Sequence, residues 1–157
     1  AKSAVYVSGE EPRLLEARGV RLGAFICGES LYPEIARALA MAGAELLANP
    51  SNDYWFGQPQ AAAHQLQVAS LRALETRRYL VRATATGISA VVDPHGRILI
   101  QSDGTGPEVL HASLQRSSAV TPYHHVGDLP LAAAATLIAS TSLIARRSRN
   151  TQPGGKS

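Results

Sequence analysis

Cysteine is almost absent from this chain: among its 157 residues, only Cys27 is a cysteine. A single cysteine cannot form a disulfide within the chain, and no cluster of cysteine and histidine has the spacing of a zinc site. The sequence also has no glycine-rich phosphate loop and no basic-aromatic pattern of the kind that binds nucleic acid. We therefore expect no metal, no cofactor and no nucleic-acid partner.

Aromatic residues are scarce as well, at 5% of the chain, whereas hydrophobic residues as a whole make up 45%. This Ala-, Leu- and Arg-rich composition is globular and excludes a disordered or fibrous chain. The length is sufficient for one domain with a buried core.

Acidic residues are missing from residue 129 onward, where four basic residues occur. The preceding part carries 11 Lys and Arg against 12 Asp and Glu, so the net charge of +3 arises from the tail. The charge is therefore no argument for a nucleic-acid partner.

Charge of either sign is absent from residues 129–145, LPLAAAATLIASTSLIA. About 17 residues is the lower limit for a membrane-spanning helix. Because Ala, Thr and Ser make this run weakly hydrophobic, a buried amphipathic helix is the alternative. A spanning helix would place the arginines of residues 146–149 in the cytoplasm. We therefore expect a domain at 1–128, a transmembrane helix at 129–145 and a basic, disordered cytoplasmic tail at 146–157.

The apolar periodicity of the remaining chain predicts an α/β fold. We expect helices at 33–41 and 60–78, and strands at 21–26, 45–49, 79–83, 88–93 and 98–100, with a weaker strand at 108–114. The sequence DPHGR at 93–97 predicts the turn of a hairpin. This order of elements indicates an α/β sandwich rather than a helical bundle.

Cys27 follows the first of these strands and precedes the helix that begins near Pro33. A thiolate is a strong nucleophile where its surroundings lower the thiol pKa. Gly28 would permit an unusual backbone angle and leave its N–H open to an oxyanion. Glu29 could orient such a site, or it could be a solvated acid near a helix start. The alternative for Cys27 is a small buried hydrophobe.

A loop rich in turn residues follows the second strand and contains Asn52, Asp53, Tyr54, Trp55 and Phe56. Such a loop can line a pocket for an acyl chain or lie at a membrane interface. Alternatively, Trp55 and Phe56 plug the core at one end of the sandwich. We take Asn52, Asp53, Trp55 and Phe56 as candidate substrate-binding residues.

Four segments together resemble one family. They are GVRLGAFICGESLYPEIAR, GAELLANPSNDYWFG, LRALETRRYLVRATATGISAVVDPHGRI and TPYHHVGDLP, within residues 5–145. In this order and spacing they are similar to the apolipoprotein N-acyltransferase family, bacterial membrane enzymes with a nitrilase-like (carbon-nitrogen hydrolase) domain. The resemblance implies an α-β-β-α sandwich on the extracytoplasmic face of the inner membrane, followed by a last transmembrane helix.

The resemblance also implies a chemistry. Members of this family use a Glu-Lys-Cys triad, whose cysteine takes an acyl group from a phospholipid as a thioester. The acyl group then passes to the N-terminal amine of the lipidated cysteine of a lipoprotein. The nucleophile of the family matches Cys27, the acid two residues later matches Glu29, and the aromatic loop matches Trp55 and Phe56 at the acyl entrance. With the Gly28 N–H, Cys27 and Glu29 are the candidate catalytic residues.

Three departures from the family pattern stand out. The family usually has Tyr at the position of Gly28 and Asn at the position of Ala85. The Glu and Lys of its triad lie well upstream of the cysteine, and Lys2 has the wrong context to replace the lysine. We therefore expect this chain to be a C-terminal portion that is inactive alone. The alternatives are another carbon-nitrogen hydrolase, such as an amidase, and a membrane-anchored remnant without catalysis that binds lipid or protein.

Overall fold

The computed structural model describes residues 11–56 and 59–150 of the chain. The chain divides into two compact units, with the division between His124 and His125. The first unit contains a mixed sheet and two long helices, and the second contains one long helix.

Among the described residues, the sheet of the first unit has six strands, in the order in which they occur in the chain. They are β1 (Leu14–Ala17), β2 (Val20–Ala24), β3 (Leu46–Ser51), β4 (Leu80–Thr84), β5 (Ala90–Val92) and β6 (Ile98–Gln101). The three strands β2, β3 and β4 pair in parallel, and the other pairs are antiparallel. Since parallel neighbours need crossover connections, a helix follows both β2 and β3.

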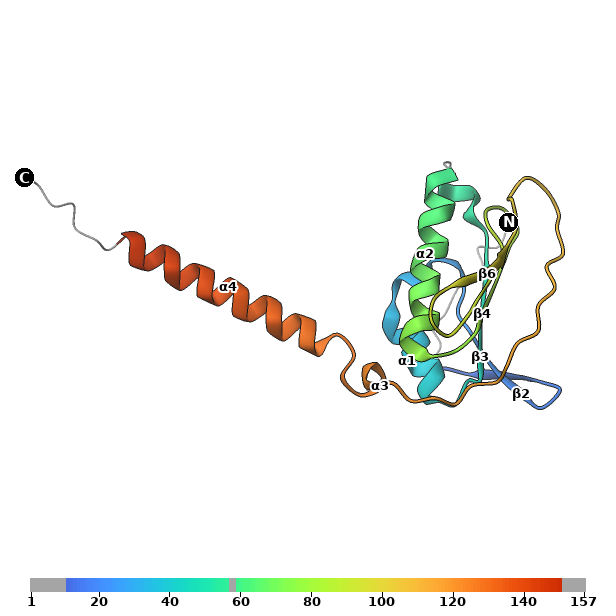
Figure 1. Ribbon diagram of the computed structural model, residues 1–157, viewed down its shortest axis with the longest axis horizontal. Helices are drawn as coiled ribbons and strands as arrows, with labels where there is room; N and C mark the ends of the chain where they lie inside the picture. Colours follow the sequence, from blue (N-terminus) through green and yellow to red (C-terminus); the bar gives the residue numbers. More distant parts are fainter. Residues whose placement is uncertain (1–10, 57–58, 151–157) are drawn as a thin grey trace, which may run out of the picture. The chain divides into compact units, whose positions relative to one another are not determined.

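The crossover helices are α1 (Pro33–Met41) and α2 (Pro59–Thr76). They contact each other and cover one face of the sheet (Figure 1). Proline suits the first turn of α1, and Gly43, with a φ of 100°, allows the chain to leave the helix. Between helices and sheet lies the core, which consists of Phe25, Ala36, Leu39, Ala44, Leu47, Leu66, Ala69, Ala73, Leu80, Ala90 and Val92.

Two short 3₁₀ helices lie beyond the ends of the parallel strands. The first, η1 (Cys27–Leu31), follows β2, and the second, η2 (Asp53–Phe56), follows β3. Because parallel strands end at the same edge of a sheet, both segments lie at the edge where ligands bind in α/β proteins.

Most of the predicted elements are confirmed. The helix predicted at 33–41 has these bounds, and β5 and β6 form the predicted hairpin around 93–97. The strand predicted at 108–114 is wrong, because residues 107–121 have no regular structure. Its alternating pattern occurs beyond β6, the last strand of the sheet, and no strand pairs with it in the described ranges. The prediction did not include β1.

The second unit contains α4 (Leu129–Asn150), and the short helix α3 (Pro122–Val126) crosses the boundary between the units. The helix α4 includes the residues predicted to span a membrane, and its Leu129, Leu131, Leu137 and Ile138 side chains are exposed. Across residues 11–56 and 59–150, no helix combines the length and hydropathy required of a membrane span. The spanning helix at 129–145 stays a prediction.

Candidate functional site

Cys27 is the first residue of η1 and has a φ of 50°. This left-handed conformation costs a residue with a Cβ about 1–2 kcal/mol, so the surrounding structure must hold it. Phe25, two residues before the cysteine, is fully buried, and its N–H donates to the Ala48 carbonyl at 3.0 Å. The sequence suggested that Gly28 would supply an unusual backbone angle. The structure corrects this, because the strained angle belongs to Cys27 and Gly28 has no positive φ.

The thiol of Cys27 is partly exposed and lies 3.8 Å from the backbone oxygen of Asn52. Hydrogen bonding to the Ser51 hydroxyl lowers the pKa of this thiol, and the backbone groups of Asn52 and Gly28 lower it further. Burial and the negative charge of Asp53 oppose these effects, but the pKa remains below its ordinary value. The thiol therefore ionises more readily than an ordinary cysteine, and the thiolate is the reactive form of cysteine.

Glu29 is exposed and turns back on its own element. Its Oε2 atom accepts a hydrogen bond from the Ile26 N–H at 2.5 Å, as a capping residue does at the start of a helix. It also lines a cavity of about 510 Å³ together with Arg13, Glu34 and Leu39. In this structure Glu29 holds the turn that carries Cys27.

The aromatic loop presents its side chains to the solvent. Trp55 is 84% exposed and Tyr54 is 73% exposed, with their rings edge to face at 6.3 Å. The interpretation that Trp55 plugs the core is therefore wrong, whereas the side chain of Phe56 lies outside the described residues. On η1 and its flanks, Ile26, Leu31 and Tyr32 are also exposed. An apolar surface of this kind beside a reactive thiol suits an apolar ligand.

The two polar residues that precede the aromatics bind the protein itself. The Asn52 Oδ1 atom accepts hydrogen bonds from the Thr86 hydroxyl at 2.6 Å and from the Tyr54 N–H at 3.2 Å. Asp53 is buried, and Arg82 donates to both of its carboxylate oxygens at 2.9 Å. The carboxylate of Asp53 thus faces Arg82 inside the domain, whereas Asn52 remains exposed.

Sequence reasoning missed three residues near the thiol, namely Asn49, Ser51 and Arg82. Asn49 and Arg82 are fully buried and lie opposite each other in neighbouring parallel strands. A signal was available, because each follows a buried leucine by two residues, so a polar residue occupies a core-facing position. Buried polar residues of this kind require partners, and their partners lie beside Cys27.

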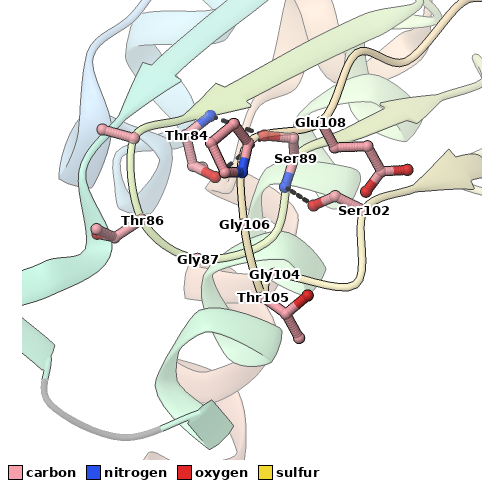
Figure 2. A pocket seen from close by; sticks show the side chains of 11 residues that line it. Thr84, Thr86, Gly87, Ser89, Ser102, Gly104, Thr105, Gly106 and Glu108 are labelled. Atoms are coloured by element: carbon pink, nitrogen blue, oxygen red, sulfur yellow. Dashed lines mark hydrogen bonds between the residues drawn. The ribbon is translucent and has the colours of Figure 1, made fainter.

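A second cavity, of about 440 Å³, lies between the loops 84–89 and 102–108 (Figure 2). Its lining is mostly hydroxyl groups and glycines, with Glu108 as the one acid. Figure 2 shows the Ser89 N–H directed at the Ser102 hydroxyl, at 2.9 Å. Ala85, where the family usually has Asn, also lines this cavity. Through the bond from Thr86 to Asn52, one wall of the cavity is tied to the loop beside Cys27.

Comparison with known proteins identifies relatives of the whole first unit. The family model "Carbon-nitrogen hydrolase" matches residues 2–121. The apolipoprotein N-acyltransferase of Azotobacter vinelandii is 40% identical over 141 residues, which are 90% of this chain and 27% of that protein. The enzyme of the same name from Pseudomonas syringae is 40% identical over 134 residues, 85% of this chain and 26% of that protein. The chain thus spans about a quarter of the length of these curated relatives.

Solved structures with a similar fold are amidases and related proteins. A cysteine-to-alanine mutant of an amidase from Nesterenkonia, of the nitrilase superfamily, matches with a TM-score of 0.54 and 25% identity, covering 68% of this chain and 42% of that one. Nit3 of Saccharomyces cerevisiae matches with a TM-score of 0.53 over 62% of this chain and 39% of its own, at 24% identity. The predicted α/β fold of the nitrilase superfamily is therefore confirmed. The chain belongs to the carbon-nitrogen hydrolase family.

Proposed function

We propose that Cys27 is the acyl-carrying nucleophile of an N-acyltransferase of the apolipoprotein type. The observation that carries this proposal is the state of the thiol: it lies at the carboxyl end of a parallel strand, partly exposed, with a lowered pKa. The 40% identity to enzymes named apolipoprotein N-acyltransferase supports the choice of reaction.

The reaction has two half-reactions. The thiolate attacks the carbonyl carbon of a phospholipid ester, a C–S bond forms, and the ester C–O bond breaks as the lysophospholipid leaves as its alcohol with a proton. The amine of the acceptor then attacks the thioester, a C–N bond forms, and the C–S bond breaks. The thiolate is regenerated and the amine proton leaves. The Gly28 N–H, at the start of η1, is the backbone donor that we assign to the oxyanion.

The acyl donor and acceptor follow from the same proposal. A phospholipid would supply the acyl group, and the lipidated N-terminal cysteine of a lipoprotein would accept it. The exposed side chains of Ile26, Leu31 and Trp55 would contact the acyl chain and keep water from the thioester. We place the domain on the extracytoplasmic face of the bacterial inner membrane, with residues 129–145 as its anchor.

Catalysis by this route needs groups that the described residues do not bring to Cys27. In the family that the sequence resembles, a Glu and a Lys complete the triad, and they belong to a part that precedes the segments matched here. We therefore propose that the 157-residue chain forms no thioester by itself and provides the nucleophile within a longer polypeptide.

A chimera tests the proposal. This chain replaces the matching 141 residues of the Azotobacter vinelandii enzyme, and transfer of labelled acyl groups from phospholipid to a lipopeptide amine is measured. We expect transfer, an acyl adduct on Cys27 that hydroxylamine removes, and a loss of at least about a thousandfold in the Cys27→Ala chimera. Ser70→Ala, in the middle of α2, is the matched control. Acyl transfer by the Cys27→Ala chimera would contradict the assignment of Cys27 as the nucleophile. A thioester formed on the 157-residue chain alone would contradict the proposal that this chain is inactive by itself.

The likeness to amidases supports a second candidate. In one solved structure, 28% identical with a TM-score of 0.51, the active-site cysteine of the Nesterenkonia amidase carries the acetamide moiety of fluoroacetamide. That adduct shows that the cysteine of the amidase is the reactive group. An amidase acting through Cys27 would form an acyl thioester from an amide, release ammonia and pass the acyl group to water. Release of ammonia from short amides by the chimera, without transfer to the lipopeptide, would favour this candidate.

A further inference from the structure

Arg82 is a charged residue in the middle of β4, and its side chain is fully buried. Both oxygens of Asp53, 3% exposed, accept hydrogen bonds from its Nη2 atom at 2.9 Å. A buried ion pair gains little stability over an apolar pair of similar volume, so its use in a core calls for another explanation. The partners of the two residues provide one.

The first set of contacts leads to the backbone of Cys27. A second nitrogen of Arg82, Nη1, donates to Oδ1 of Asn49, the residue opposite it in the neighbouring strand. This bond fixes the orientation of the Asn49 amide, with its oxygen toward Arg82 and its nitrogen toward the segment that carries Cys27. The Nδ2 atom then donates to the carbonyl of Phe25 at 2.8 Å and to that of Cys27 at 3.4 Å. Arg82 thus acts on both sides of the strained backbone of Cys27.

The second set of contacts leads to the sulfur. The Ser51 hydroxyl lies 2.8 Å from Asp53 Oδ1 and 3.4 Å from Nη2 of Arg82. Asp53 follows Asn52 directly, and the backbone oxygen of Asn52 lies 3.8 Å from the sulfur of Cys27. The ion pair therefore also fixes the chain segment on the other side of the thiol.

We propose that Arg82 is a positioning residue for Cys27, which holds the backbone of the cysteine through Asn49 and the segment facing its sulfur through Asp53. The proposal rests on the function proposed for Cys27 and adds a residue to the same site. Arg82 itself touches no reacting atom in this account. It fixes a conformation that Cys27 would otherwise leave, because a side chain with a Cβ disfavours a φ of 50°.

The reactivity of the thiol provides the test, because Cys27 is the only cysteine of the chain. Alkylation by iodoacetamide therefore reports on this thiol alone, and its rate against pH gives the thiol pKa. Among the described residues, Asp53 on η2 acts on the thiol by its charge. The other charged groups bonded to these neighbouring segments include Glu29 on η1, which accepts from Ile26, Arg82 on β4, which pairs with Asp53, and Arg72 on α2, which donates to the Ser30 carbonyl. Each of the variants below leaves Glu29 and Arg72 in place.

Three variants of the 157-residue chain are compared with the unchanged chain. Arg82→Lys keeps the positive charge but cannot bond Asn49 and Asp53 through two separate nitrogens. Arg82→Met removes the positive charge. Arg82→Met combined with Asp53→Leu removes the whole ion pair. The matched control is Arg78→Lys, a buried arginine that precedes β4 and donates to the carbonyls of Ala44, Thr76 and Ala119. Circular dichroism and thermal unfolding show which variants are folded.

We expect the profiles of folded Arg82→Lys and Arg82→Met to move to higher pH, with alkylation at pH 7 slower by at least about threefold, since one pKa unit changes the thiolate fraction about tenfold. In the double variant, loss of the Asp53 charge, which raises the thiol pKa, opposes this shift, so its profile should lie at lower pH than that of Arg82→Met. The profile of Arg78→Lys should stay in place even where its Tm falls. An unchanged profile in folded Arg82→Lys or folded Arg82→Met, or an equal shift in Arg78→Lys, would overturn the proposal. If the chimera formed no acyl adduct while the alkylation profiles still differed, the proposed function would fail and the role of Arg82 would stand.

Discussion

The thiol of Cys27 lies among several hydrogen-bonding groups, and the Ser51 hydroxyl has the largest effect on its pKa. We predict that Ser51→Ala raises this pKa toward its ordinary value, because the thiolate loses a hydrogen-bond partner. Below the new pKa, the alkylation rate should fall, and above it the two chains should react alike. Mass spectrometry of the iodoacetamide adduct, repeated across pH, measures the alkylation rate both below and above the new pKa. In the control Ser70→Ala, the hydroxyl lost is bonded within α2, so a shift there equal to that of Ser51→Ala would contradict the prediction.

Gly28 has no strained backbone angle, and a Cβ atom added to it would meet nothing within 4 Å. We therefore predict that Gly28→Ala stabilises the chain by about 0.4–1 kcal/mol, because alanine lowers the entropy of the unfolded state. Urea unfolding measures the change.

Gly87 provides the contrast for this prediction. It has a φ of 105°, and its added Cβ would lie 2.3 Å from Oδ2 of Asp53. Gly87→Ala should therefore destabilise the chain by more than about 1 kcal/mol. Equal changes in the free energy of unfolding for the two substitutions would contradict the difference in backbone conformation between Gly28 and Gly87.

At the scale of an element, the β5–β6 hairpin depends on Asp93. Its Oδ1 atom accepts from the His95 N–H at 2.8 Å and the Arg97 N–H at 3.0 Å, and its Oδ2 atom accepts from Arg97 Nε at 2.8 Å. We predict that Asp93→Ala lowers the free energy of unfolding by about 1–3 kcal/mol at pH 7. Thermal unfolding checks this, with the exposed Asp103→Ala as the variant expected to lose less.

The same carboxyl predicts a pH dependence. Burial raises the pKa of Asp93, but hydrogen bonds from the Arg97 and His95 backbone N–H groups outweigh it, so the pKa is lowered. The stabilisation is therefore present above the ordinary pKa of an aspartate and is lost as the pH falls through the lowered one. The difference in stability between the unchanged chain and Asp93→Ala should be largest at neutral pH and narrow on acidification. A difference that stayed constant down to pH 2 would contradict this.

Elements with strong local signals were predictable from the sequence. The helix at 33–41 has a proline at its start and a glycine after its end, and the hairpin has a turn that its own residues close. Within the part of the chain that the structure describes, β1 pairs with β2 alone, and its side chains are mostly exposed, so its pattern carries little signal. The segment 108–114 has the alternation of a strand but lies where the sheet has already ended. Whether β1 and residues 108–114 form strands depends on pairing with a neighbouring strand, which the local sequence does not encode.

For the whole molecule, Cys27 was predictable from local sequence, whereas the residues that contact its surroundings from other strands were not. The cysteine and the loop with Asn52 and Trp55 were predicted as site residues from local composition and from a family resemblance. The role of Arg82 depends on contacts with Asn49 and Asp53, 33 and 29 residues away, and only the parallel pairing of β3 and β4 brings them together. Glu29 follows Cys27 by two residues in the sequence, but its bond to Ile26 depends on the turn of η1.

At this scale, the last prediction concerns residues 129–145, proposed as a membrane anchor. Leu137 lies at the middle of this segment and Leu129 at its start, and both side chains are exposed. If the segment spans a bilayer, an arginine at its centre costs about 2.5–3.5 kcal/mol, whereas one at its end reaches the interface. We therefore predict that Leu137→Arg weakens binding of the chain to phospholipid vesicles by about 100-fold and that Leu129→Arg has little effect.

Flotation of the purified chain with phospholipid vesicles measures this binding, and a chain that ends at residue 128 gives the background. The comparison separates spanning from lying on the surface, because a helix in the plane of the interface keeps both leucines at a similar depth. In that arrangement, the two arginine variants would be weakened alike. Equal losses would therefore contradict the spanning helix, and failure of the unchanged chain to float above the background would contradict any anchoring by α4. A selective loss at Leu137 requires a helix that passes through the hydrocarbon core.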